Sequence, residues 1–434
     1  MKIVNDSNCG WLKQLPKRKN INVIKEDLKC DYLIIGAGFT GLSAARQLGE
    51  IQKNKKIIII DAQLAGEGAS SRNSGYLVDT TLNDGFTSNK KHQDYLKKVK
   101  IYKQGINSVK KFINEYQVDC DWNECGKYFA SSKIEDEIKV KEFSKLLTKI
   151  NYKNEILYQN DLKKRLGTEF YKVALYTYGG ILINPAKLAR SMISALPQNV
   201  NIYENSTLIK WSKQNKKIYA RINKHNLITD KIIFCSNGFL NLLGVKKRYS
   251  FPLTLTASMT RQLTEKEFES IGQPKEWGIL PVRPMGATVR MTKDRRILIR
   301  NTVENKKPNF MDNNDLTKNL KYHKIGLKKR FSSLPEDIIE NTWSGVVCRS
   351  GNGSQIFEKL DENIYVAGCY NGSGIGVGTL FGEQIALMAS NQQSDIIQVI
   401  EDRKKPNWLP PQPFLNIGIN SRLFYERLKA NSEI

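Results

Sequence analysis

Asp31-Tyr-Leu-Ile-Ile-Gly-Ala-Gly-Phe-Thr-Gly41 is the stretch of sequence that decides the fold. Its apolar first half, Asp31–Ile35, is typical of a buried parallel strand. The three glycines that follow, Gly36, Gly38 and Gly41, have the spacing of a phosphate-binding turn. In such a turn the first glycine bends the chain, the second lets the backbone approach a pyrophosphate, and the third lets a helix pack closely on a strand.

The residues after this stretch complete a strand–helix–strand unit. A helix is expected over 42–48, with its free N–H groups directed at phosphates, and a second buried strand over 56–60. Asp61 stands at the end of that strand, twenty residues after Gly41, where an acidic side chain accepts hydrogen bonds from an adenosine ribose. Together these features predict a dinucleotide bound to a Rossmann-type fold.

Two further glycine-rich loops favour FAD over NAD as that dinucleotide. The first, Gly66–Gly75, follows Asp61 closely, and an NAD-binding domain has no need of it. The second runs from Gly368 to Gly378 after an expected strand over 363–368, and it leads into a helix expected over 379–390. The N-terminus of that helix would stabilise negative charge near the flavin N1 and O2 positions.

Composition sets limits on the class of protein. The 434 residues suit two or three domain-sized units, and seven scattered cysteines argue against a disulfide scaffold. Cys120 and Cys125 lack a second cysteine pair or a nearby histidine, so no metal site is expected. Residues 1–28 lack the apolar core of a signal peptide, and no run of about 18 apolar residues occurs. The sequence therefore predicts a cytoplasmic protein without a membrane span.

The formal net charge is +25, from 68 Lys and Arg against 43 Asp and Glu. The excess is spread along the chain, and clusters such as Lys53–Lys56 and Lys246–Arg248 are not interleaved with stacking aromatics. Solvated faces are the expected explanation, and no nucleic-acid partner is expected. Nucleic-acid binding and attraction of an acidic small substrate stay open as alternatives.

The motifs resemble those of the D-amino-acid-oxidase superfamily of FAD oxidoreductases, and within it the gamma-glutamylputrescine oxidase-like branch. The resemblance covers about 11–389 and is most specific at Gly68-Ala-Ser-Ser-Arg-Asn-Ser-Gly75. The sequence departs from the family pattern at Ser71, Ser74 and Ser373. The other segments that carry the resemblance are 36–41, Asp61-Ala62, Ser236-Asn-Gly-Phe239, 288–298 and 368–376.

The resemblance implies an FAD that is held non-covalently, because none of the three histidines lies in the loop motifs. It also implies a strand near Leu208 that lends a backbone contact to the adenine. The cofactor-binding residues that it implies are Gly36, Gly38, Phe39, Thr40, Gly41, Asp61, Ala62, Gly68, Ala69, Ser70, Arg72, Asn73, Gly75, Leu208, Asn237, Gly238, Gly372, Gly374, Ile375, Gly376 and Val377.

The expected architecture is α/β, with a Rossmann-type FAD-binding domain and an antiparallel-sheet substrate domain. Residues 1–30 would form an N-terminal extension and 396–434 a C-terminal tail. The FAD-binding domain is expected to be discontinuous, over 31–85, 150–240 and 340–395. The substrate domain would take 86–149 and 241–339.

The expected reaction is oxidation of the C–N bond of an amine or amino-acid-like substrate, with O2 or another electron acceptor. Arg290 or Arg296 could anchor an anionic substrate through its planar guanidinium, although a surface pair or an interdomain salt bridge is the favoured explanation of these residues. Tyr370 would wall the pocket or simply pack. No general base stands out. The alternatives are 2-hydroxy-acid oxidation, an RNA-modifying flavoenzyme and a flavin-binding module without activity.

Overall fold

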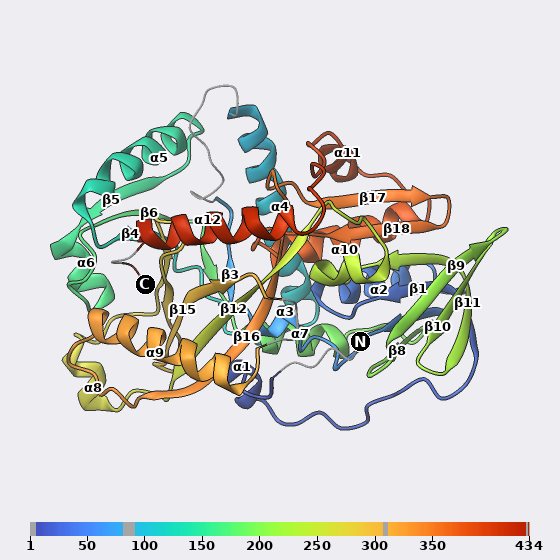
Figure 1. The fold of residues 1–434 in the computed structure, drawn as a ribbon, viewed down its shortest axis with the longest axis horizontal. Coiled ribbons are helices and arrows are strands. Elements are labelled where there is room, and N and C mark those ends of the chain that lie inside the picture. Colours follow the sequence, from blue (N-terminus) through green and yellow to red (C-terminus); the bar gives the residue numbers. More distant parts are fainter. Residues whose placement is uncertain (1–5, 81–91, 307–310, 431–432, 434) are drawn as a thin grey trace.

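The computed structural model describes residues 6–80, 92–306, 311–430 and 433. Two eight-stranded sheets dominate these residues, one on the right and one on the left of Figure 1. A two-stranded ribbon, β3 (Tyr76–Leu77) with β7 (Ile181–Leu182), forms a third, small sheet. Among the described residues, no helix is long and apolar enough to cross a membrane.

The first sheet has five parallel strands at its centre, in the order β18-β11-β1-β2-β8. Its β2 consists of four buried isoleucines, as expected of a parallel strand whose two faces are both covered. Antiparallel β17 flanks β18, and the β9–β10 hairpin pairs with β11. The strands are β1 (Leu28–Ile35), β2 (Ile57–Ile60), β8 (Val200–Tyr203), β9 (Leu208–Gln214), β10 (Lys217–Ile222), β11 (His225–Phe234), β17 (Ile356–Asp361) and β18 (Ile364–Gly368).

Helices cover one face of this sheet. Alternate strand residues such as Ile34 and Ile59 pack on these helices, whereas Leu33 and Ile58 pack on the β9–β10 hairpin. The helices that share this layer are α2 (Phe39–Ile51), α4 (His92–Glu115), α7 (Pro185–Ser194) and α10 (Gly376–Ala389).

The second sheet has the order β16-β12-β15-β14-β13-β4-β6-β5 and is antiparallel except where β13 meets β4. Helix α9 (Asn313–Arg330) packs against β15 on one face. The strands are β4 (Lys127–Ser131), β5 (Asn154–Tyr158), β6 (Val173–Thr177), β12 (Phe251–Thr260), β13 (Gly278–Pro281), β14 (Thr288–Met291), β15 (Ile297–Glu304) and β16 (Ile339–Arg349).

The remaining helices are short, except for two. Helix α5 packs on β5 and β6, and α12 packs on the second sheet through its Ala430, Ile419 and Leu423. These helices are α1 (Gly10–Lys13), α3 (Ala69–Arg72), α5 (Glu137–Lys149), α6 (Gln159–Leu166), α8 (Glu265–Ser270), α11 (Asp395–Glu401) and α12 (Phe414–Ala430), with 3-10 turns at Ile134–Asp136 and Asn237–Leu243.

The strands divide between the sheets at other points than the sequence predicts. β5 and β6 belong to the second sheet, although the sequence predicts that 150–240 belongs to the FAD-binding domain. β16 also belongs there, because it pairs with β12 from Phe251↔Arg349 onwards. These pairings join residues far apart in sequence, so local patterns do not reveal them. The expected boundary between 85 and 86 lies outside the described residues.

Candidate active site

The expected cofactor residues gather at one edge of the first sheet. β18, β11, β1 and β2 are neighbouring parallel strands, so their carboxyl ends meet at that edge. The glycine loops follow the ends of β1, β2 and β18, and Asn237 and Gly238 follow β11. Ligands of open α/β sheets bind in the crevice outside these strand ends.

The first turn is close-packed backbone. Gly36 has a φ of +101° and donates its N–H to the Ile60 carbonyl at 2.8 Å. A Cβ on Gly41 would lie 1.8 Å from the Gly36 carbonyl oxygen, so only glycine fits where α2 begins. A Cβ on Gly38 would lie 2.9 Å from Ser70 Oγ. The glycine roles predicted from the spacing therefore have a steric basis.

The N-termini of α2 and α10 converge on this turn. A Cβ on Gly382 would lie 2.2 Å from the Thr40 carbonyl oxygen, and one on Gly378 would lie 3.0 Å from Thr40 Oγ1. On the other side of α10, a Cβ on Gly105 of α4 would lie 2.6 Å from Gly376. Two helix N-termini side by side direct unpaired N–H groups and partial positive charge at the same place, which suits a pyrophosphate and the flavin ring.

Asp61 links the ends of β1 and β2. Its Oδ2 accepts the Ala37 N–H at 2.8 Å and its Oδ1 accepts the Gln63 N–H at 2.9 Å. Burial raises the pKa of Asp61 to about 6, and the two N–H donors oppose that rise. Each carboxylate oxygen keeps a lone pair for a further donor, so the residue fits a ribose diol.

The second glycine loop is tied to the first. Ser70 Oγ accepts the Phe39 N–H at 2.9 Å, and Gly66 donates to the Ala37 carbonyl at 2.8 Å. Asn73 folds its side chain back, accepting from the Gly75 N–H and donating to the Ala69 and Ser70 carbonyls. This loop therefore presents backbone towards the cofactor edge.

Arg72 corrects one expectation. Its guanidinium points away from the first turn and pairs with Asp6, while also donating to the Glu67 and Ser344 carbonyls. Its side chain is 3% exposed. The Arg72 side chain thus joins the second glycine loop to Asp6 and to Ser344. Only the backbone of Arg72 is left for a contact with a cofactor.

The third glycine-rich loop, which follows β18, completes the cofactor edge. Asn237 Oδ1 accepts the Cys369 N–H at 2.9 Å, which joins the ends of β11 and β18. Ser236 Oγ, beside Gly36, is buried without a hydrogen-bond partner. Ser206 donates its N–H to the Asp61 carbonyl at 2.8 Å, which brings the start of β9 at Leu208 to the same side. An unsatisfied buried hydroxyl and a cradle free of Cβ atoms are what a bound dinucleotide requires.

Sequence reasoning missed three of the contacts that shape this edge. Glu204 accepts the Ala65 N–H at 2.6 Å and pairs with Arg18 of the N-terminal segment. Gly105 and Gly382 make the close helix contacts described above. Glycines 374, 378 and 382 recur every fourth residue, the spacing of one helix face, and this signal could have identified Gly382.

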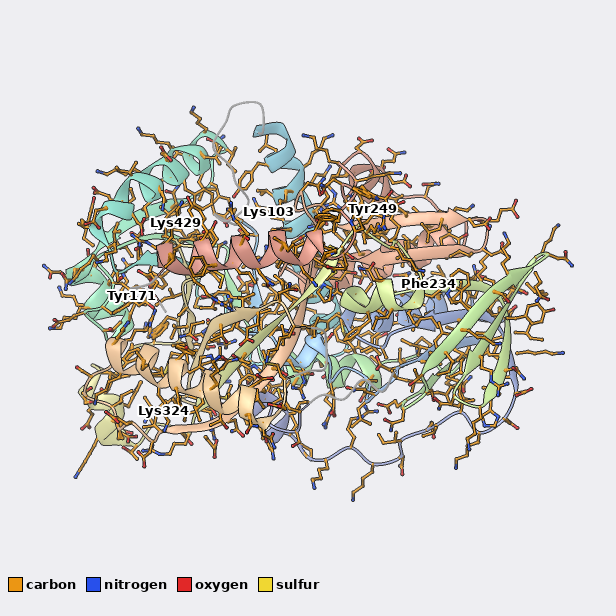
Figure 2. All side chains as sticks on the ribbon, in the orientation of Figure 1. Lys103, Tyr171, Phe234, Tyr249, Lys324 and Lys429 are labelled. Carbon is orange, nitrogen blue, oxygen red and sulfur yellow. The ribbon has the colours of Figure 1, made fainter. Side chains whose placement is uncertain are left out.

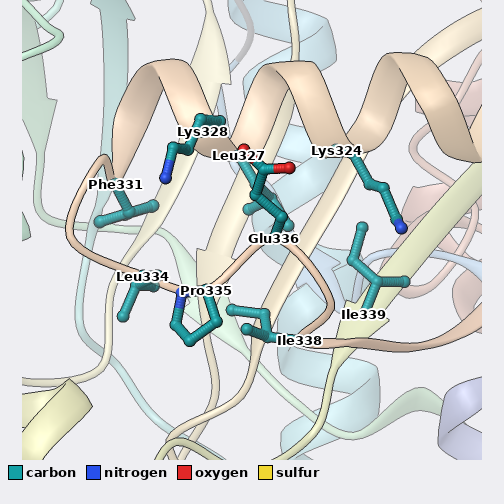
Figure 3. Close-up of a pocket in the computed structure, with 9 residues that line it drawn as sticks. All are labelled: Lys324, Leu327, Lys328, Phe331, Leu334, Pro335, Glu336, Ile338 and Ile339. Carbon is teal, nitrogen blue, oxygen red and sulfur yellow. The ribbon is translucent and has the colours of Figure 1, made fainter.

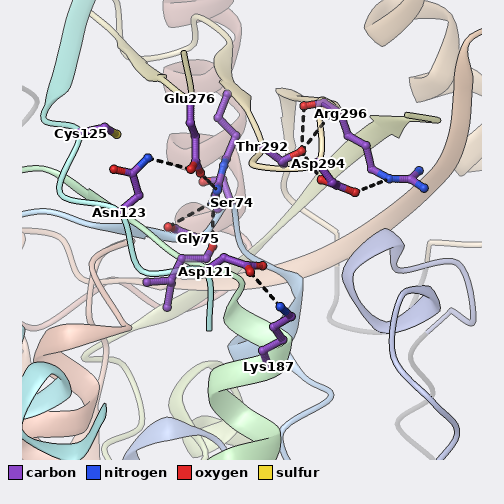
Figure 4. Close-up of polar contacts among 12 residues, drawn as sticks. Ser74, Gly75, Asp121, Asn123, Cys125, Lys187, Glu276, Thr292, Asp294 and Arg296 are labelled. Carbon is purple, nitrogen blue, oxygen red and sulfur yellow. Dashed lines mark hydrogen bonds and ion pairs between the residues drawn. The ribbon is translucent and has the colours of Figure 1, made fainter. Parts of the chain in front are cut away.

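Arg290 is held by the protein itself. Its Nη1 donates to the Ser74, Gly75 and Ile183 carbonyls, and its Nη2 pairs with Glu276 at 2.9 Å. Burial lowers its pKa, and only 1% of the residue is exposed. Glu276 also accepts from Asn123, and Figure 4 shows these two residues close to Ser74 and Gly75. The guanidinium thus locks the second glycine loop onto β14, and its role as a substrate anchor is not supported.

Arg296 and Tyr370 are also committed elsewhere. Arg296 pairs with Asp294 at 2.9 Å and with Glu340 at 2.6 Å (Figure 4 draws the first pair). Tyr370 is 6% exposed in the core of the first sheet, where its hydroxyl shares a hydrogen bond of 2.6 Å with Thr40 Oγ1. Packing, the alternative expected for Tyr370, describes its surroundings.

The second sheet turns one face towards the cofactor edge. This inner face carries Arg290 and its cross-strand neighbour Leu298, and Leu298 packs with Trp11 and Trp343 in the cluster between the two sheets. Thr288 and Arg300 form the next pair on the same face. The side chains that sheet pairing gathers on this face were not predicted as a group.

Arg300 and Lys127 are the cations on this face that sequence reasoning overlooked. Arg300 donates to Thr288 Oγ1, has no carboxylate partner among the described residues, and its pKa is lowered to about 10 by burial and by Arg349. Lys127 of β4 is fully buried and pairs with Asp79. Burial lowers its pKa, and Asp79 opposes that effect.

A small surface hollow lies away from this edge. It is formed by the C-terminal half of α9 and the turn that follows it, with Leu327, Phe331 and Ile338 at its base and Lys324, Lys328 and Glu336 at its rim (Figure 3). None of the glycine loops contributes to it. It has no feature that suits a dinucleotide.

The model of the family of FAD-dependent oxidoreductases called DAO matches residues 31–388. The gamma-glutamylputrescine oxidoreductase of Escherichia coli strain K12 is 25% identical over 372 residues, which cover 84% of each chain. A probable oxidoreductase, OrdL, of Haemophilus influenzae is 24% identical, with 82% of each chain covered. Both matches extend over most of the length of the two relatives.

The fold is similar to that of solved flavoenzymes. Glycine oxidase from Geobacillus kaustophilus superposes with a TM-score of 0.69 over 85% of this chain and 96% of its own, at 16% identity. The family match at 31–388 includes the glycine loops, Asp61 and the two converging helix N-termini. The chain therefore belongs to the DAO family of FAD-dependent oxidoreductases.

Proposed function

We propose that the protein oxidises the C–N bond of an amine or amino-acid-like substrate. The observation that carries the proposal is the cofactor edge of the first sheet, where three glycine loops and Asp61 meet opposite the inner face of the second sheet. Its similarity to the gamma-glutamylputrescine oxidoreductase, whose name states an amine substrate, supports the choice of reaction.

Bound FAD would supply flavin N5 as the acceptor for a hydride from the carbon next to the amine nitrogen, and the imine left behind would hydrolyse in water. The protein holds and positions the reactants. The N-termini of α2 and α10 would neutralise phosphate and flavin charge, and Asp61 would accept hydrogen bonds from the ribose. O2 or another acceptor would remove the electrons afterwards.

For the substrate anchor we propose Arg300 in place of Arg290 and Arg296. The guanidinium groups of Arg290 and Arg296 already bind carbonyls and carboxylates of the protein. Arg300 lies on the inner face with a single hydrogen bond, to Thr288, and its planar fork suits a carboxylate. An anionic, amino-acid-like donor follows from this choice. A carboxylate anchor would hold a 2-hydroxy acid as well, so the reaction needs its own test.

The test is a flavin-bleaching screen of the purified holoprotein under anaerobic conditions. Amines, amino acids and 2-hydroxy acids are added separately, and the products of each donor that bleaches the flavin are analysed. We expect an amine or amino acid to bleach it and to release ammonia or a smaller amine. Bleaching by 2-hydroxy acids alone, with a keto acid as the product, would contradict the proposal.

A further inference from the structure

Helix α12 exposes an apolar surface that the fold leaves uncovered. Five large apolar side chains are exposed by 60% or more in the described chain, and four of them lie on α12: Phe414 (66%), Ile417 (60%), Phe424 (65%) and Leu428 (63%). The fifth is Ile138 of α5 (67%). We call the four residues of α12 the outer stripe. Clustered exposed apolar side chains of this kind mark interaction sites.

The outer stripe follows the period of the helix. Its members are three, seven and four residues apart, so they lie on one side of α12. The opposite side carries Ile419, Leu423 and Ala430, which pack against the second sheet around Leu253 and Val303. The helix is therefore apolar on two opposite faces, of which the fold buries one. Figure 1 shows α12 crossing the front of the molecule, with no other element over it.

Basic groups accompany the stripe. Helix α12 carries Arg422, Arg427 and Lys429 against one acidic residue, Glu426. Arg422 pairs with Glu426 and Arg427 donates to the Val303 carbonyl, whereas Lys429 lies over the Tyr425 ring beside the stripe. Figure 2 shows Lys429 at the C-terminal end of α12. The segment before the helix adds Lys404, Lys405 and the half-exposed Trp408, whose ring lies 5.5 Å from the Arg248 guanidinium. Arg248 belongs to the basic cluster Lys246–Arg248, which is not part of the cofactor edge.

The apolar stripe and the basic residues near it together favour an anionic lipid surface over a second copy of the chain. A second copy of the chain would bring two proteins of net charge +25 together, with the basic flanks of both stripes in close proximity. An anionic lipid surface offers the opposite charge to the flanks and an apolar layer to the stripe. Interfacial helices have this composition, with Phe, Leu and Trp on one side and Lys and Arg beside them.

We propose that the outer stripe of α12 docks the protein on an anionic lipid bilayer, with the helix lying in the plane of the interface. The 17 residues of α12 are bound to the second sheet along their inner side, which fits a helix that lies on a membrane. The proposal goes beyond the oxidoreductase function and does not depend on it, because it rests on the surface of α12 alone.

The test uses flotation of the FAD-loaded protein with vesicles of phosphatidylcholine, with or without about one third phosphatidylglycerol, a fraction that gives a strongly negative surface. We expect binding to the mixed vesicles that weakens as salt rises, and little binding to pure phosphatidylcholine. The variant F414S/F424S/L428S should bind at least tenfold more weakly. Its three side chains are all more than 60% exposed, so its flavin content and Tm should match those of the wild type.

The matched control is Ile138→Ser, which removes an equally exposed apolar side chain on α5 and should leave vesicle binding unchanged. Three outcomes would overturn the proposal: no binding to mixed vesicles at low salt, equal binding to both vesicle types, or equal loss of binding in the control. A dimer that sedimentation velocity detects in the wild type and not in the triple variant would assign the stripe to a second copy instead.

Discussion

The cofactor edge of the first sheet and the inner face of the second sheet lie opposite each other but are built differently. The cofactor edge consists of backbone: glycines, helix N-termini and turns, in which few side chains besides Asp61 and Ser70 take part. The inner face consists of side chains brought together by strand pairing, such as Arg290, Arg300 and Lys127. Backbone sites depend on local sequence spacing, whereas side-chain sites depend on long-range register.

The largest effect should come from filling the backbone site. Gly41→Val places a Cβ 1.8 Å from the Gly36 carbonyl oxygen. Overpacking costs about 1–3 kcal/mol where neighbours can yield, and a backbone carbonyl at the start of α2 yields little. We expect a protein with little or no FAD and a clearly lower Tm. The flavin absorbance released on acid precipitation measures the first effect, and a thermal melt measures the second.

Gly418→Ala is the control for this substitution. A Cβ at Gly418 of α12 would meet nothing within 4 Å. Alanine should therefore keep the FAD content and slightly raise the stability, since glycine inside a helix costs about 0.5–1 kcal/mol relative to alanine. Normal FAD loading in Gly41→Val would show that the first turn does not bind the pyrophosphate as inferred.

The next effect concerns Asp61, the carboxylate at the end of β2. Asp61→Ala removes the acceptor of the ribose hydroxyls, and hydrogen bonds to a charged group contribute about 1.5–3 kcal/mol. We expect the dissociation constant of FAD to rise by about 10- to 150-fold. Titration of the apoprotein with FAD measures it. An unchanged constant would assign the ribose contact to another residue.

The pKa of Asp61 gives this contact a pH dependence. The pKa is raised to about 6 by burial, so in the FAD-free protein the carboxyl group holds a proton below that pH. The ribose hydroxyls favour the ionised form, so FAD affinity should fall as the pH decreases below about 6, by up to tenfold per unit. It should be constant above that pH. Asp61→Asn should show no such dependence, and a parallel fall in this variant would assign the titration to another group.

The inner face is tested by a smaller change. Arg300→Lys keeps the charge but loses the planar fork, so the KM for an anionic donor should rise about tenfold while FAD content stays normal. Arg296→Lys is the matched control, because its partners Asp294 and Glu340 lie in the protein. Steady-state and flavin-reduction kinetics with a donor found by the screen measure both. Equal effects in the two variants would exclude Arg300 as the anchor.

The sequence allowed the cofactor edge to be predicted because its chemistry follows the chain. Gly36, Gly41 and Asp61 belong to one strand–helix–strand unit, and their spacing is fixed by local geometry. The inner face could not be predicted in this way. Arg290 and Arg300 share the inner face because they pair with Leu298 and Thr288 across the β14–β15 hairpin. Only the structure reveals that the Arg290 guanidinium is held by three carbonyls.

The same distinction explains why strands of the second sheet lie in segments that are expected to belong to the FAD-binding domain. β6 belongs to the second sheet because it pairs with β4, about fifty residues earlier, and nothing near β6 in sequence indicates its partner. Arg72 illustrates the point for a single side chain. It lies in the motif that the sequence predicts for the cofactor, but the direction of its guanidinium depends on Asp6, which the N-terminal segment brings into contact.

The smallest effect should come from Tyr370, which lies in the core of the first sheet and contacts Thr40 at the cofactor edge. Its hydroxyl shares a hydrogen bond of 2.6 Å with Thr40 Oγ1, and burial holds its pKa well above the usual range, so it stays protonated. Tyr370→Phe keeps the ring in the core beside Phe381 and leaves the Thr40 hydroxyl without this partner. The loss should be about 1 kcal/mol of stability, seen as a small fall in Tm. If Tyr370 only packs, flavin reduction by a turned-over donor keeps its wild-type rate and its dependence on donor concentration. If Tyr370 contacts the donor, these kinetics change in addition to the small fall in Tm, and the core of the first sheet would then contribute a side chain to the substrate site.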